Sequence, residues 1–233
     1  MMKANVKVLF KTPVRMPNGL QWFENELFVM VMDQLTDDIY VLGENGEVIR
    51  IINTETENGS GIAVGGGFIW TACNGTASAR PPRPTDNHIS KVRKIDLVSG
   101  ETVDLFNTPD GGGIHGLEWE DGNIWITAFN PKSLILIDGT SFEIIRKFSC
   151  DLNVLHGLAL DGEGIWCSDR AEKLVVKFHK KTGEKMEELK LPTDGPDPHG
   201  LTIREGQLWY SDADFPMAQG MRGYPEIGVI SYQ

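Results

Sequence analysis

The sequence predicts an all-β fold, a five-bladed β-propeller built from four-stranded antiparallel blades. Three observations lead to this prediction. A short phrase of the form X-G-L or X-G-I recurs five times, each time with an aromatic residue ten positions after X. Alternating apolar runs between the copies end at turns, and the chain has 26 Gly and 12 Pro. The chain also begins with an alternating run, 4–12, that has no hairpin partner of its own.

The five copies of the phrase define the blades. Their first residues are Asn18, Ser60, His115, His156 and His199. We expect a single domain, 1–233, with blades at about 14–54, 55–109, 110–151, 152–193 and 194–233. The last blade lacks its fourth strand. We expect the run at 4–12 to supply it, because pairing the two ends of the chain closes the ring and removes an open sheet edge.

Two insertions, 75–88 and 213–226, interrupt this regular pattern. The first contains R-P-P-R-P, and proline cannot donate to a sheet, so a central strand is excluded there. Both insertions follow the second strand of a blade. We therefore expect two surface loops above the same end of the propeller, and the pattern leaves open whether they act as a lid.

Composition excludes several classes of partner. The net charge of −11 disfavours nucleic acid and anionic membrane surfaces, since both attract basic proteins. The three cysteines are an odd number without C-x-x-C spacing, which favours a reducing compartment over a disulfide framework. No apolar run approaches the length of a membrane span. We expect a soluble cytoplasmic protein, and the sequence makes no prediction of its oligomeric state.

The first strand of each blade should line the central channel, and the second returns antiparallel to the same end. Residues that begin first strands and end second strands therefore share one rim. The candidate substrate-binding residues of this rim and of the two insertions are Asn18, Ser60, Asn74, Asn130, Arg80, Arg83 and Arg222. Cationic loops on an acidic protein suggest an anionic substrate. The alternative is that the loop arginines are simply solvated.

Three of the rim positions are histidines from consecutive blades, His115, His156 and His199. Three neutral imidazoles around an axis, with a position left open for water or substrate, suit a divalent metal ion. We predict these three as metal ligands, with zinc, iron, manganese and magnesium as candidates. The alternative is that each histidine anchors its blade through a hydrogen bond to the backbone.

Three polar residues that end second strands are candidate catalytic groups. Asp169 and Asp212 occupy equivalent positions in consecutive blades, where each could orient a histidine or act as a base. Turn capping by these aspartates explains the pattern equally well. Arg170, beside Asp169, is suited to hold an anionic group of a substrate.

The phrase H-G-L-A-L-D-G-E-G-I-W-C-S-D, 156–169, resembles the blade motif of the NHL, SMP-30 and virginiamycin B lyase group of propellers. The spaced histidines are most similar to the lyase branch, which includes the peptidyl-hydroxyglycine amidating lyase, where channel histidines hold zinc. The resemblance implies that the three histidines are metal ligands, or ligands plus a base. Two departures are the blade number, since those families have six or more, and Asn18-Gly19-Leu20, where SMP-30 lactonases have a metal-binding E-G-P.

These features together predict a metal-dependent lyase that acts on a small substrate at the channel mouth. The metal would polarise an oxygen of the substrate while a rim base removes a proton, so that a C–O or C–N bond breaks. Two alternatives remain open at this point. One is a hydrolase of the SMP-30 lactonase type, and the other is a propeller that binds a small molecule without catalysis.

Overall fold

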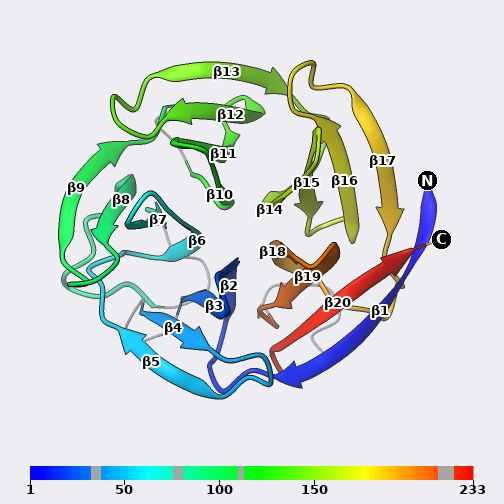
Figure 1. Ribbon diagram of the computed structural model, residues 1–233, viewed down its shortest axis with the longest axis horizontal. Helices are drawn as coiled ribbons and strands as arrows, with labels where there is room; N and C mark the ends of the chain where they lie inside the picture. The colour runs from blue at the N-terminus through cyan, green and yellow to red at the C-terminus, as the bar shows by residue number, and fades with distance from the viewer. Residues whose placement is uncertain (33–37, 76–80, 110–112, 215–222, 233) are drawn as a thin grey trace.

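The computed structural model describes residues 1–32, 38–75, 81–109, 113–214 and 223–232, and in these ranges the chain forms only strands, turns and irregular segments. Viewed down its shortest axis, the molecule is a ring of small sheets around a central axis (Figure 1). The β-propeller predicted from the sequence is therefore confirmed as an architecture. Among the described residues, no helix is long and apolar enough to span a lipid bilayer.

The strands fall into four groups by their distance from the axis (Figure 1). The inner strands are β2 (Pro17–Phe23), β6 (Gly59–Gly65), β10 (Leu117–Glu120), β14 (Leu155–Asp161) and β18 (Pro198–Arg204). The second strands are β3 (Glu26–Val31), β7 (Phe68–Asn74), β11 (Asn123–Phe129), β15 (Gly164–Asp169) and β19 (Gln207–Asp212). The third strands are β4 (Ile39–Leu42), β8 (Ser90–Asp96), β12 (Lys132–Asp138), β16 (Leu174–His179) and β20 (Glu226–Tyr232). The outer strands are β5 (Val48–Ile52), β9 (Thr102–Asn107), β13 (Ile144–Ser149), β17 (Lys185–Lys190) and β1 (Met2–Lys11).

The prediction of five separate four-stranded antiparallel blades is wrong. The described strands form three four-stranded sheets and one eight-stranded sheet with the order β14-β15-β16-β17-β1-β20-β19-β18. The N-terminal strand β1 causes this fusion. It pairs antiparallel with the C-terminal strand β20, as expected, but its first residues extend further and pair in parallel with β17, at Met2–Leu189 and Lys3–Lys190. An outer strand exposes unpaired backbone groups, and a neighbouring chain end that reaches them can satisfy them.

The inner strands contact one another in a closed cycle, β2–β6–β10–β14–β18–β2. They approach so closely because the second residue of each repeated phrase is glycine. A Cβ atom built on Gly116 would lie 2.0 Å from the carbonyl oxygen of His156, and one on Gly61 would lie 2.1 Å from that of His115. The strands thus pack backbone against backbone. A cavity of only about 10 Å³ remains on the axis, about the space of one water molecule.

The indole rings of the second strands fill the spaces between neighbouring units. Trp70, Trp125 and Trp166 are almost fully buried and Trp209 is 4% exposed, each in an apolar cluster that spans two units. The aromatic residue that recurs ten positions into each repeat thus packs between neighbouring units at these four places.

A buried polar network crosses the inner strands below the glycines. The Gln21 amide nitrogen donates to Oε1 of Glu118 at 2.8 Å, and the Val64 backbone N–H donates to the Gln21 amide oxygen at 2.9 Å. The Trp119 backbone N–H also donates to Glu118, at 3.0 Å. Burial raises the pKa of Glu118 to about 8, against the smaller effect of these hydrogen bonds. The carboxyl group is therefore protonated at neutral pH.

Replacing a channel glycine should destabilise the protein strongly. In Gly116→Ala the new methyl group meets a fixed backbone carbonyl rather than a mobile side chain. We therefore expect the free energy of unfolding, measured in urea, to fall by at least the usual overpacking cost of about 1–3 kcal/mol. Gly195→Ala is the matched control, because its Cβ would have no neighbour closer than 3.0 Å. Equal stability of the two variants would contradict backbone packing at the axis.

Glu118 should make stability fall as the pH rises from about 4.5 to about 8. The unfolded chain releases this proton near pH 4.5 and the folded protein only near pH 8, so the folded state binds more protons in between. Stability therefore decreases as pH rises through this window, by about 1.4 kcal/mol per pH unit at most, and levels off above the folded pKa. Urea unfolding of Glu118→Gln should show no decrease in the free energy of unfolding between pH 6.5 and 8, a range that lies within this window. The exposed-site control Glu163→Gln should retain the decrease, and a wild-type slope in Glu118→Gln would refute the assignment.

Candidate functional site

The residues that begin the repeated phrases lie at one end of the axis, above the glycines. His156 and His199 are 3% and 2% exposed, and His115 is half-buried. The structure brings these three side chains together as a row of rings, which we call the histidine row. The ring centroids of His115 and His156 are 4.3 Å apart with a 34° tilt, and those of His156 and His199 are 4.7 Å apart at 68°.

Backbone carbonyls determine the protonation of the two outer rings. Nδ1 of His115 lies 3.2 Å from the carbonyl oxygen of Leu155, and Nδ1 of His199 lies 2.9 Å from that of Asp197. A carbonyl oxygen only accepts, so Nδ1 of His115 carries the hydrogen and its neutral ring has the lone pair on Nε2. Nδ1 of His199 also lies 3.5 Å from the Ala213 backbone N–H, and the shorter contact, to the Asp197 carbonyl, favours the same tautomer. In His115 this Nε2 accepts a hydrogen bond from the Asn74 side-chain amide at 3.0 Å.

Burial keeps all three rings neutral at physiological pH. It lowers the pKa of His115 to about 4 and that of His199 to about 3, and the nearby Arg170 guanidinium lowers both further. The pKa of His156 lies well below 6.5, first because of burial and then because of its two neighbouring imidazoles and Arg170. The positive charge of Arg170 therefore acts on the whole histidine row.

Two buried polar atoms at this end have no hydrogen-bond partner among the described residues. They are Nδ1 of His156 and Oδ1 of Asn18, and the Asn18 amide nitrogen donates to the carbonyl oxygen of Gly59 at 3.1 Å. Buried polar atoms without partners are rare, and each calls for water or a ligand. Nδ1 of the central ring therefore lacks a hydrogen bond of normal geometry, and the ring lies in the field of Arg170, while a weaker interaction with the His199 backbone raises the pKa of His156 slightly.

The two aspartates predicted as catalytic hold the loops that lead into the inner strands. Asp169 accepts from the backbone N–H groups of Asn153 and Val154, and Asp212 accepts from that of Asp197 at 3.1 Å. The structure thus gives both carboxylates the partners expected of turn capping. Asp212 also supports His199 indirectly, because the Asp197 carbonyl is the acceptor for that ring.

The other predicted rim residues differ in their surroundings. The Ser60 hydroxyl lies 2.7 Å from the carbonyl oxygen of Ile114 and joins two neighbouring inner strands. Asn74 orients His115 as described, whereas Asn130 is exposed beyond the end of β11. Arg80 and Arg222 lie outside the described residues. Ser60 and Asn74 therefore contribute to the architecture of the rim.

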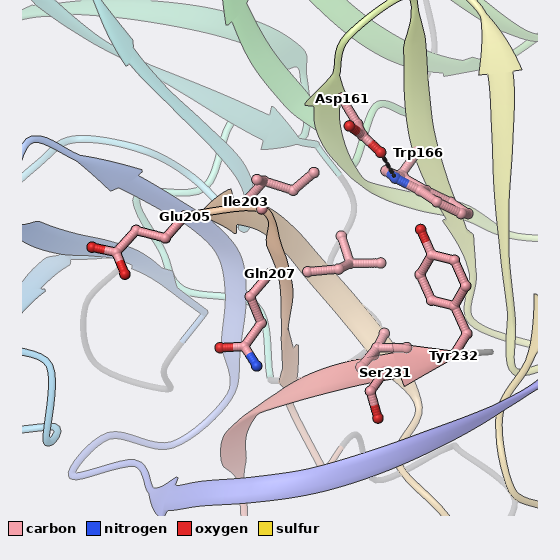
Figure 2. A pocket seen from close by; sticks show the side chains of 10 residues that line it. Asp161, Trp166, Ile203, Glu205, Gln207, Ser231 and Tyr232 are labelled. Carbon is pink, nitrogen blue, oxygen red and sulfur yellow. Dashed lines mark hydrogen bonds between the residues drawn. The ribbon is translucent and has the colours of Figure 1, made fainter.

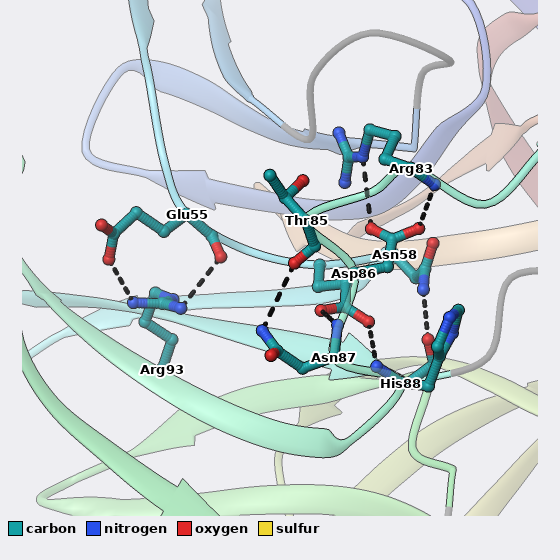
Figure 3. Close-up of polar contacts among 10 residues, drawn as sticks. Glu55, Asn58, Arg83, Thr85, Asp86, Asn87, His88 and Arg93 are labelled. Atoms are coloured by element: carbon teal, nitrogen blue, oxygen red, sulfur yellow. Dashed lines mark hydrogen bonds and ion pairs between the residues drawn. The ribbon is translucent and has the colours of Figure 1, made fainter.

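Arg83 is held within its own loop. Its Nε lies 3.3 Å from Asp86, which also accepts from the Arg83 backbone N–H (Figure 3). The same loop is tied to the segment before β6, since the Glu57 carboxylate accepts from the backbone N–H groups of Asn87 and His88 at 2.6 Å each. These bonds fix the described part of the insertion, 81–88, beside β6 and β7.

Sequence reasoning missed a set of hydroxyl groups that lock the rim. Thr127, Ser168 and Ser211 each stand twelve positions after a rim histidine. The Gly116 backbone N–H donates to Thr127 Oγ1 at 2.8 Å, the Gly200 N–H donates to Ser211 Oγ at 2.9 Å, and Ser168 Oγ donates to the His199 carbonyl at 3.2 Å. Alignment of the three histidine repeats on one another would have found this position.

The predicted metal site fits these contacts poorly. Both ring nitrogens of His115 have protein partners, and the rings form a row rather than directing three nitrogens at one point. Across the described ranges, no group of three His, Cys, Asp or Glu side chains is arranged to hold a metal ion.

Comparison with known proteins supports the β-propeller fold but identifies no sequence family. No protein family model matches the sequence, and no curated protein matches it by sequence. The resemblance to the NHL, SMP-30 and virginiamycin B lyase group therefore stays a prediction.

Solved structures of β-propellers resemble this one. The glutaminyl cyclase of Myxococcus xanthus has a TM-score of 0.72 at 10% identity, over 100% of this chain and 98% of that one. The WD40 β-propeller domain of Doa1 has a TM-score of 0.55 at 13% identity, over 90% of this chain and 62% of that one. Hydrazine synthase of Kuenenia stuttgartiensis also has a TM-score of 0.55, at 12% identity, over 81% of this chain and 66% of that one. At these identities the likeness establishes the β-propeller fold alone.

Proposed function

We propose that the histidine row is the active site of a lyase that acts on a small anionic substrate. The observation that carries this proposal is the unpartnered Nδ1 of His156, buried between two neutral imidazoles and under the charge of Arg170. Since the axis is closed by the glycines, substrate enters and product leaves at the rim.

Electrostatics explain why an anionic substrate suits this site. A second positive charge is disfavoured in the row, because burial and Arg170 both oppose protonation of His156. An anionic group bound near Arg170 offsets this charge and raises the pKa of His156 toward the range in which a general base is effective. Binding of the substrate thus activates the base. His156 takes a proton from carbon, the C–H electron pair forms a double bond, and the C–O or C–N bond breaks.

A second candidate reaction is cyclisation of an N-terminal glutaminyl residue. It is favoured by the likeness to the Myxococcus xanthus glutaminyl cyclase, which spans nearly all of both chains. In such a reaction an amine attacks a side-chain amide and ammonia leaves, so a neutral imidazole is needed to accept and return a proton. The product distinguishes the reactions, since a lyase leaves an unsaturated or carbonyl compound and cyclisation leaves a lactam.

The proposal is tested by mass spectrometry on a panel of small hydroxy and amino carboxylic acids and glutaminyl peptides. With a substrate found, His156→Ala should lower kcat/KM by about 100-fold or more, the usual contribution of a general base. Arg170→Ala should mainly raise KM for anionic substrates. His179→Ala, at the end of β16, is the matched control and should leave both parameters unchanged.

Full activity of His156→Ala would refute the base assignment. Binding of panel compounds without turnover would instead favour the third possibility, a propeller that only binds a small molecule.

The pH dependence gives an independent check. A base must be deprotonated to act, so kcat/KM should be lost only as pH falls through the pKa of His156 in the free enzyme. Because burial holds that pKa well below 6.5, kcat/KM measured in stopped assays should remain at its neutral-pH value at pH 5.5. An acid limb centred near 6.5, with the protein still folded by circular dichroism, would contradict a buried histidine as the base.

A further inference from the structure

A cavity of about 330 Å³ lies at the other end of the inner strands, away from the histidine row. It opens between the β14–β15 hairpin and the β18–β19 hairpin, inside the fold of the eight-stranded sheet. Figure 2 shows Asp161 and Trp166 on one side, Ile203 and Gln207 on the other, and the Tyr232 hydroxyl directed toward Trp166. Its volume is that of a small-molecule site.

Comparison of the internal repeats indicates which kind of side chain could fill this cavity. Four residues after the rim position, two of the repeats carry tryptophan, and each indole packs against the buried tryptophan of the preceding unit. Trp119 stacks on Trp70 with ring centroids 6.2 Å apart, and Trp22 meets Trp209 edge-on at 5.1 Å. The equivalent residue beside Trp166 is Ile203, which is smaller and leaves the space open.

The charge around this space selects among aromatic ligands. Where Trp22 fills its junction, the Arg204 guanidinium lies 4.1 Å from the ring centroid, at the last position of its inner strand. The same position of β14 is Asp161, so a carboxylate stands where the other junction has a cation. Two donors, Trp166 Nε1 at 3.0 Å and Lys177 Nζ at 2.7 Å, both bind Oδ2 of Asp161, whose side chain is 39% exposed.

Further acidic groups surround the cavity. Glu205 lines it, and Glu187 shares Lys177 with Asp161. Burial raises the pKa of the Tyr232 phenol, and the carboxylates of Glu187 and Asp161 raise it further. Three carboxylates, Asp161, Glu187 and Glu205, thus accompany one cation, Lys177, whose Nζ also lies 5.3 Å from the Trp166 ring centroid.

We infer that this cavity is a second binding site, for a small aromatic compound that carries a positive charge. The aromatic ring occupies the place that Trp119 and Trp22 fill in the other junctions, and packs against Trp166 and Ile203. The positive group faces Asp161. The site is independent of the histidine row and of the reaction proposed there.

The test compares three probes that share one ring and differ in charge: tryptamine, indole and indole-3-acetate. Isothermal titration should show tryptamine binding more tightly than indole, and indole more tightly than indole-3-acetate. Ile203→Trp should lower the affinity for tryptamine by at least about 10-fold, because the new indole fills the cavity. Ile203→Phe serves the same purpose should the tryptophan variant fail to fold. Asp161→Asn should reduce the preference for tryptamine over indole-3-acetate by about 5-fold or more.

Two controls separate this site from others. Ile203→Val keeps the cavity open and should bind tryptamine within about 2-fold of wild type. His156→Ala alters the histidine row only and should bind it equally well. Undiminished binding to both cavity-filling variants, absence of tryptamine binding to the wild type at millimolar concentration, or tighter binding of indole-3-acetate would each overturn the inference.

Discussion

The close approach of the inner strands is the constraint on which the rest of the structure depends. Each inner strand sets a glycine against the backbone of the next, and in Gly116 and Gly61 the missing Cβ would lie about 2 Å from a carbonyl oxygen. No other residue type permits this distance. Because the described inner strands pack so tightly, the cavity between their glycines has room for about one water molecule, which directs ligands to the ends of the axis or to the spaces between units.

The tight axis also concentrates the side chains that precede the glycines. Residues one position before the glycines are brought to one small rim, so three histidines far apart in sequence form a row with centroids 4.3 and 4.7 Å apart. Crowding has an electrostatic consequence. Burial keeps the three rings neutral, and the carbonyls of Leu155 and Asp197 favour a hydrogen on Nδ1 of the two outer rings. The same packing that stabilises the ring thus sets the protonation of the candidate site.

Differences among the repeats, rather than the repeat itself, create places where ligands bind. Nδ1 of His156 has no hydrogen-bond partner, whereas Nδ1 of His115 faces the Leu155 carbonyl and Nδ1 of His199 faces the Asp197 carbonyl. The cavity near Trp166 is lined by Ile203, at a position where two of the other repeats carry tryptophan and two carry Val64 and Leu160. Both features combine an ordinary repeat position with one departure from the pattern.

The sequence by itself determined the β-propeller architecture, the rim positions and the recurrence of an aromatic residue ten positions after each of them, because these follow from periodic spacing along the chain. Contacts between residues of different repeats are not encoded by this spacing, and only the tertiary structure decided them. The extra length of β1 joins it to β17 and merges two predicted blades into one sheet. The carboxylates of Asp169 and Asp212 accept hydrogen bonds from backbone N–H groups, and the Asn74 amide donates to His115 in the next unit. These outcomes depend on distances between atoms of different repeats, and only the closed ring fixes those distances.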